Sequence, residues 1–163
     1  MMKGKKEDDV NVKHLTISQS KGHGVSGFNS LYSNGMSFHL FHLKIEKSGS
    51  YGVFVYETKR NTMSNCQVSH SKGSGVFVRK GLLTINGSGT SIHNNGITDG
   101  MSDQRGLYTY SSSSSIHLVS PLTLESITNN GGGGNYGGDG TIVIVDNEGT
   151  IIEMIQEATE ADY

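Results

Sequence analysis

Cysteine, proline and tryptophan are nearly absent from this 163-residue chain, which has one Cys, one Pro and no Trp. A single cysteine excludes an intramolecular disulfide framework. Aromatic residues make up 7% and hydrophobic residues 33% of the chain, a composition that does not fit a helical bundle. The chain also lacks an apolar run long enough for a membrane span. Glycine, in contrast, is abundant, with 23 residues.

The charge is close to balanced, at a formal net charge of -2. The Lys and Arg residues do not cluster in the sequence, which argues against a nucleic-acid-binding protein, since such proteins need a basic face. Residues 1–9 are charged and lack the apolar stretch of a signal peptide, so we expect a mobile leader. Cytoplasmic residence is the default expectation, unless the chain is a piece of a longer secreted protein.

An internal repeat dominates the sequence. Its three copies are residues 15–25, 43–53 and 66–76. Each copy opens with apolar residues at alternate positions, as in Leu43-Lys44-Ile45, which is typical of a strand with one buried face. Each copy closes on Gly-Val, and a more degenerate copy closes on Gly-Ile. The spacings between these glycines are 28, 23 and 21 residues, a range typical of solenoids; the glycines are Gly24, Gly52, Gly75 and Gly96.

Small residues occupy the expected corners between strands. The repeat glycines predict either a positive φ or a close approach of the backbone. Ser20, Ser48 and Ser71 recur at one place in the repeat and predict a ladder along a corner. Cys66 takes the place of Leu15 and Leu43, so we expect a buried small apolar residue there.

The composition favours a β-solenoid over helical repeats, because Gly, Ser, Asn, Thr and Val replace the Ala, Leu and Glu of the latter. The motif, an apolar-x-apolar pair followed by Asn or Ser and then Gly-Val, resembles the right-handed parallel β-helix repeat family, the pectate-lyase-like superfamily. The likeness is clear over residues 12–97 and looser over 106–145. It implies an all-β, single-stranded right-handed parallel β-helix of about six or seven coils and says almost nothing about activity.

We assign the β-helix to residues 10–149 and a C-terminal cap or edge segment to residues 150–163. Ile151, Ile152 and Ile155 fall close to helical spacing and favour an amphipathic helical cap, whereas the β-branched start of this segment leaves a last edge strand open. The serine run 111–115 predicts an exposed turn or a polar strand. The glycine-rich stretch 129–140 predicts an irregular loop.

Two sequence features are candidates for ligand binding. The glycine-rich stretch lacks the Gly-Lys-Ser/Thr sequence of a phosphate-binding loop, so a linker or lid is favoured. His14 and His42 occupy the same place in adjacent coils, but Asn65 takes that place in the third coil. Without a His-x-His or His-x-x-x-His cluster accompanied by carboxylates, we predict no metal site and no cofactor.

The resemblance also implies a form of catalysis. Polysaccharide lyases and epimerases of that superfamily act from a groove beside one parallel sheet, with Asp or Glu, often calcium, and an Arg or Lys base. The closest local match here is a weak candidate set, Asp99, Asp103 and Arg105. The set has no companion carboxylate cluster, and the Asp-Pro-His motif of alginate epimerases is absent.

Two functional hypotheses follow from the sequence. The favoured one is a non-catalytic β-solenoid that acts as a scaffold or binding module for a polysaccharide or a protein, with no nucleic-acid or membrane partner. Self-association through the ends of the solenoid is part of this hypothesis, because an open coil exposes unpaired backbone groups. The alternative is a polysaccharide-active enzyme of the lyase or epimerase type, or a degenerate remnant of one.

Overall fold

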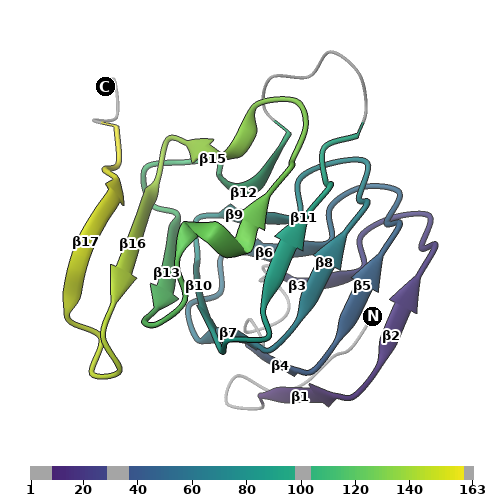
Figure 1. Ribbon diagram of the computed structural model, residues 1–163, viewed down its shortest axis with the longest axis horizontal. Coiled ribbons are helices and arrows are strands. Elements are labelled where there is room, and N and C mark those ends of the chain that lie inside the picture. The colour runs from purple at the N-terminus through teal and green to yellow at the C-terminus, as the bar shows by residue number, and fades with distance from the viewer. Residues whose placement is uncertain (1–8, 29–36, 98–103, 160–163) are drawn as a thin grey trace.

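The computed structural model describes residues 9–28, 37–97 and 104–159. These residues form a parallel β-helix, in which the chain visits three sheets in turn and each coil adds one strand to each sheet (Figure 1). Five coils are complete, and a sixth begins with the last parallel strand of the first sheet. The predicted all-β parallel solenoid is therefore confirmed.

The sheets are called A, B and C in the order in which the chain meets them. Sheet A consists of β1 (Val10–Lys13), β4 (Phe38–Phe41), β7 (Asn61–Ser64), β10 (Leu82–Asn86), β13 (Ser115–Val119), β16 (Thr141–Val145) and β17 (Ile151–Gln156). Sheet B consists of β2 (Thr16–Ser18), β5 (Lys44–Glu46), β8 (Gln67–Ser69), β11 (Ser91–His93) and β14 (Ile127–Thr128). Sheet C consists of β3 (Val25–Phe28), β6 (Val53–Tyr56), β9 (Val76–Arg79), β12 (Arg105–Thr109) and β15 (Gly134–Gly138).

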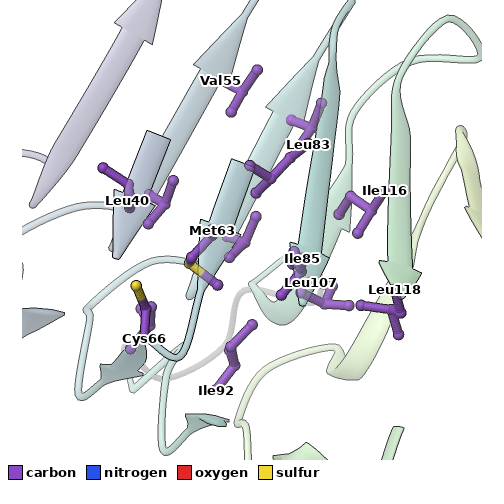
Figure 2. Packing of buried hydrophobic residues seen from close by; sticks show 14 of the residues in the cluster. Leu40, Val55, Met63, Cys66, Leu83, Ile85, Ile92, Leu107, Ile116 and Leu118 are labelled. Carbon is purple, nitrogen blue, oxygen red and sulfur yellow. The ribbon is translucent and has the colours of Figure 1, made fainter. Parts of the chain in front are cut away.

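The core is a column of aliphatic side chains between the three sheets (Figure 2). Alternation along each short strand sends one set of side chains inward, and equivalent residues of successive coils then stack on one another. Ile45 pairs with Val68, for example, and Val68 pairs with Ile92. Cys66 is fully buried in this column, as predicted, and its sulfur accepts a hydrogen bond from the Leu43 amide at 3.4 Å.

The corners reach a left-handed backbone conformation mostly at residues other than the repeat glycines. The residue directly after nearly every strand of sheets A and B has a positive φ, and most of these residues are not glycine. After sheet A they are His14, His42, Asn65 and Gly87, and after sheet B they are Gln19, Lys47, His70, Asn94 and Asn129. In sheet C, Glu57 and Lys80, directly after β6 and β9, have a positive φ as well, so corners after all three sheets use this conformation.

The predicted serine ladder is held by backbone hydrogen bonds, because the buried hydroxyls of Ser48 and Ser71 have no hydrogen-bond partner among the described residues, and the corner continues into two asparagines. Backbone amides of the following coils donate to the carbonyl oxygens of Ser20, Ser48 and Ser71. In the fourth coil Asn95 replaces serine, and its Oδ1 accepts from the Ser71 amide at 3.1 Å. The Asn95 amide donates to Oδ1 of Asn130 at 3.0 Å, so side-chain bonds extend the ladder into the fifth coil.

Two predictions for the C-terminal third are wrong in part. The stretch 129–140 is not wholly irregular, because Gly134–Gly138 forms β15 and pairs in parallel with β12. The helical cap is absent: Ile151–Gln156 is β17, which pairs antiparallel with β16 and bears out the edge-strand alternative. The open edge of β16 stabilises an extended segment, and this pairing outweighs the helical spacing of the isoleucines. The serine run forms a turn that leads into β13.

Helical structure is minimal in the described part of the chain. It consists of one 3-10 turn, η1 (Leu124–Ser126), for which Thr123 acts as the N-cap by accepting a hydrogen bond from the Glu125 amide. No helix among the described residues has the length and apolar character needed to cross a membrane.

Candidate functional site: an aromatic face on sheet C

The outer face of sheet C carries most of the aromatic side chains of the described coils. In β6 the valines Val53 and Val55 point inward, so the intervening Phe54 points outward. Strand register then aligns Phe54 with Phe77 of β9, and Phe77 with Tyr108 of β12. We call this group of rings the aromatic face; it consists of Tyr51, Phe54, Tyr56, Phe77, Tyr108 and Tyr110.

The rings of the aromatic face contact one another across three coils. Phe77 lies at the centre, with ring centroids 4.2 Å from Tyr51, 5.6 Å from Phe54 and 5.3 Å from Tyr108. Tyr110 adds a further contact to Phe77 at 5.7 Å. Separations in this range are those of favourable aromatic pairs. The rings therefore form one continuous surface rather than isolated exposed residues.

Arg79 provides a cation within this surface. Its guanidinium carbon lies 5.4 Å from the ring centroid of Tyr56 and 5.0 Å from that of Tyr110, within the range of cation-π attraction. The side chain is exposed, and so is that of the neighbouring Lys80. Two rings therefore flank an exposed guanidinium.

Exposure varies across the aromatic face. Phe77 is only 7% exposed and anchors the cluster, whereas Tyr110 is 46% exposed. Tyr51, Phe54, Tyr56 and Tyr108 are half-buried. Such rings combine an apolar surface with, in tyrosine, a hydroxyl that can donate and accept hydrogen bonds.

Two ionisable groups beside the rings have shifted pKa values. A hydrogen bond to the Glu57 carboxylate raises the pKa of the Tyr56 phenol, which keeps that hydroxyl protonated at neutral pH. Burial lowers the pKa of His23, because the imidazolium form loses solvation. A neutral His23 stacks on Tyr51 with ring centroids 5.2 Å apart and an interplanar angle of 4°.

The sequence analysis missed the aromatic face, although the signal was present. The sequence Val-Phe-Val follows both Gly52 and Gly75. In a strand, the residue between two inward valines must point outward. Applied to both triplets, this rule places Phe54 and Phe77 on the outside, and the repeat register stacks them.

The predicted site residues fall into two groups. Asp99 and Asp103 lie outside the described residues. Arg105 is in β12, where its guanidinium donates to the carbonyl oxygens of Gly133 and Tyr136, the latter at 3.0 Å. A β-carbon at Gly137 would lie 2.6 Å from the guanidinium carbon. Arg105 thus fastens β15 to β12, and glycine at position 137 leaves room for it.

A polar cluster on sheet A was also missed by the sequence analysis. Asp9 lies 3.3 Å from Nε2 of His39 and 3.0 Å from a guanidinium nitrogen of Arg60. Nδ1 of His39 lies 2.8 Å from the Thr62 hydroxyl. The carboxylate, imidazole and hydroxyl form a chain, but Thr62 is in the middle of β7, which is paired on both sides. The backbone amides near Thr62 form the hydrogen bonds between β7 and its neighbouring strands. This cluster therefore lacks the free amide donors that stabilise the oxyanion in an acyl-transfer site.

The histidines that share a place in the repeat are indeed neighbours. The rings of His14 and His42 stack with centroids 5.0 Å apart and an interplanar angle of 5°. Within the described ranges, no three His, Cys, Asp or Glu side chains gather as metal ligands would.

Comparisons with protein-family models, curated proteins and solved structures found no match to this chain. The chemistry of the candidate site is therefore argued from its geometry.

Proposed function

We propose that the protein is a non-catalytic β-solenoid binding module that binds a glycan chain along the outer face of sheet C. The observation that carries the proposal is the continuous aromatic face, with Arg79 between Tyr56 and Tyr110. Exposed aromatic residues and arginine are the side chains most enriched at binding surfaces. We also propose that the protein is a member of the pectate-lyase-like superfamily, because its repeat motif resembles the motif of that superfamily.

The shape of the aromatic face supports a glycan over other ligands. Its rings recur once per coil, at a strand spacing of about 4.8 Å, and therefore form a row along the solenoid axis. A polysaccharide is also a linear repeat, and the apolar faces of its sugar rings pack on flat aromatic side chains. The tyrosine hydroxyls and Arg79 supply hydrogen-bond partners for sugar hydroxyl groups.

Affinity electrophoresis tests the proposal. The protein is run through native gels that contain neutral or acidic polysaccharides, with and without calcium, after a glycan array has selected the candidates. We expect retardation by at least one polysaccharide, and Tyr110→Ala should weaken the apparent affinity about tenfold, as loss of a surface aromatic anchor does. Arg79→Gln should also weaken binding, because it removes the cation between the rings.

Phe41→Ala is the matched control, since Phe41 is a half-buried aromatic on sheet A, away from the aromatic face. It should leave retardation unchanged. If no polysaccharide retards the wild-type protein, or if Phe41→Ala and Tyr110→Ala weaken binding equally, the glycan proposal fails. Release of unsaturated or epimerised sugar products would instead favour the polysaccharide-active enzyme.

A further inference from the structure

Charge is divided along the axis of the solenoid. Among the described residues, all ten Lys and Arg lie at or before Arg105, whereas residues 106–159 contain six acidic residues and no Lys or Arg. Coils stack in chain order, so each sheet runs from its first strand at one end of the molecule to its last strand at the other (Figure 1). A division in the sequence is therefore a division in space, between a basic N-terminal end and an acidic C-terminal end.

The N-terminal end combines cations with exposed apolar surface. Lys13 and Lys21 in the first coil are exposed, and Leu15 between them is 48% exposed. Val12 and Ile17 belong to the core column but are only partly buried. No described coil covers their outer side, because β1, β2 and β3 are the edge strands of their sheets at the N-terminal end.

Two acidic residues of the described coils near this end are paired with cations. Glu46 lies 2.7 Å from the Lys44 ammonium, and this contact lowers the pKa of its carboxyl. Asp9 is paired with Arg60 at 3.0 Å. The exposed Lys13 and Lys21 therefore give the N-terminal end surface of the solenoid a positive charge.

The C-terminal end has the opposite charge and a larger apolar surface. Ile151, Ile152 and Met154 of β17 are 55%, 60% and 45% exposed. Glu153 lies among them and is also exposed, as is Glu157 beyond the strand. β17 runs antiparallel to β16, with two register shifts. Such irregular edges pair poorly with a further strand, so contact at this end would be made by side chains.

We propose that the protein associates with itself head to tail, with the acidic C-terminal end of one copy docked on the basic N-terminal end of the next. The two ends are complementary in charge, and each exposes large aliphatic side chains. Two acidic ends would repel each other, which disfavours a two-fold contact through β17. A head-to-tail contact of this kind does not close, so it builds open chains of copies. This inference is independent of the aromatic face, which lies on the flank.

Ionic strength is the first test. We expect sedimentation velocity to show species larger than a dimer that grow with protein concentration at about 0.01 M salt, where charges interact over about 30 Å. At about 1 M salt the distance over which charges interact falls to about 3 Å. The association constant should then fall at least ~10-fold, because salt screens the attraction between the two ends. A wild-type protein that stays monomeric at every concentration in low salt would overturn the proposal.

Variants of the two ends identify the contact. Leu15→Asp gives the N-terminal end an acidic group, and Ile152→Lys gives the C-terminal end a basic one, so each variant alone should stay monomeric. Mixed together, they should associate again, because each copy retains one intact end. Ile97→Asp and Ile97→Lys are the controls, since Ile97 is 54% exposed after β11, between the two ends.

The controls should associate as the wild type does. A wild-type dimer that never grows, and that Ile152→Lys alone abolishes, would indicate a two-fold contact and refute the head-to-tail arrangement. Circular dichroism verifies that each variant is folded, and the salt dependence of the wild type decides the question even if one variant fails to fold.

Discussion

A β-carbon at Gly52 would lie 2.3 Å from Cγ1 of Val68 in the next coil. The same relationship recurs along the solenoid, where a corner glycine faces a β-branched residue of sheet B one coil later. The other pairs are Gly24 with Ile45, Gly75 with Ile92, and Gly106 with Ile127. None of these four glycines is among the residues with positive φ. Of the two roles predicted for the repeat glycines, close approach is therefore correct for Gly24, Gly52 and Gly75, whereas Gly96, with a φ of 69°, takes the positive-φ role.

Gly52→Ala should lower the free energy of unfolding by about 1–3 kcal/mol, because the added methyl group overpacks the corner against Val68. Urea denaturation followed by circular dichroism measures the change. Gly22→Ala is the control, since no atom lies within 4 Å of its added β-carbon, and it should change stability by less than about 0.5 kcal/mol. Equal effects of the two substitutions would contradict the close-approach role.

Asn95→Ala should be among the most destabilising substitutions in the chain. Asn95 is fully buried, and its Nδ2 donates to the carbonyl oxygens of Val68 and His93 at 3.0 and 3.1 Å. Each buried group left without a partner costs about 1–3 kcal/mol. Asn95→Asp keeps the shape and removes the donors, so it should also destabilise. Thermal unfolding measures both, and the exposed Asn11→Ala should leave the midpoint unchanged.

Stability should fall as the pH is lowered from 7 to 5, in part because of His23. Burial lowers the pKa of His23 from its ordinary value of 6.5. Between 6.5 and the lower folded pKa the unfolded chain binds more protons, so protonation favours unfolding as the pH falls through this window. His117 acts in the same direction, because burial lowers its pKa too.

His23→Phe should reduce this pH dependence, because it keeps a ring against Tyr51 but removes the titrating group. Urea unfolding at a series of pH values provides the measurement. Phe54→Leu perturbs packing beside His23, where the ring centroids are 4.8 Å apart, yet keeps the imidazole. It should lower stability and retain the pH dependence. An unchanged slope in His23→Phe would rule out His23 as a source.

Cys66 should resist thiol reagents in the folded protein. It is fully buried, and burial raises the pKa of its thiol, so little reactive thiolate forms. We expect modification by a disulfide reagent at neutral pH to be at least ~100-fold slower than in urea, because the folded protein must first open. Ser112→Cys places a second thiol on an exposed turn, where it should react at once. Rapid modification of Cys66 in the wild type would contradict its burial.

The repeat made much of the fold predictable. Leu43 and Ile45 alternate around Lys44, and such local patterns define strands without reference to distant residues. The conformation of segment 151–156 was harder to predict, because Ile151, Ile152 and Ile155 also fit one face of a helix. Its strand conformation depends on the free edge of β16, which exists only once the coils have stacked. The role of Arg105 was harder still to predict: the sequence groups it with Asp99 and Asp103 as a catalytic candidate, whereas it lies in β12 and donates to the carbonyl oxygens of Gly133 and Tyr136.

The sequence by itself determined the architecture, since strand alternation and the spacing of corner residues are local properties of the chain. Only the tertiary structure decided which residues share a surface. Phe54, Phe77 and Tyr108 are 23 and 31 residues apart along the chain, and parallel pairing brings them into one row. Stacking in chain order likewise turns an uneven distribution of charge into two oppositely charged ends. Both features arise because each coil positions its side chains against those of the next coil, a relationship that no single segment contains.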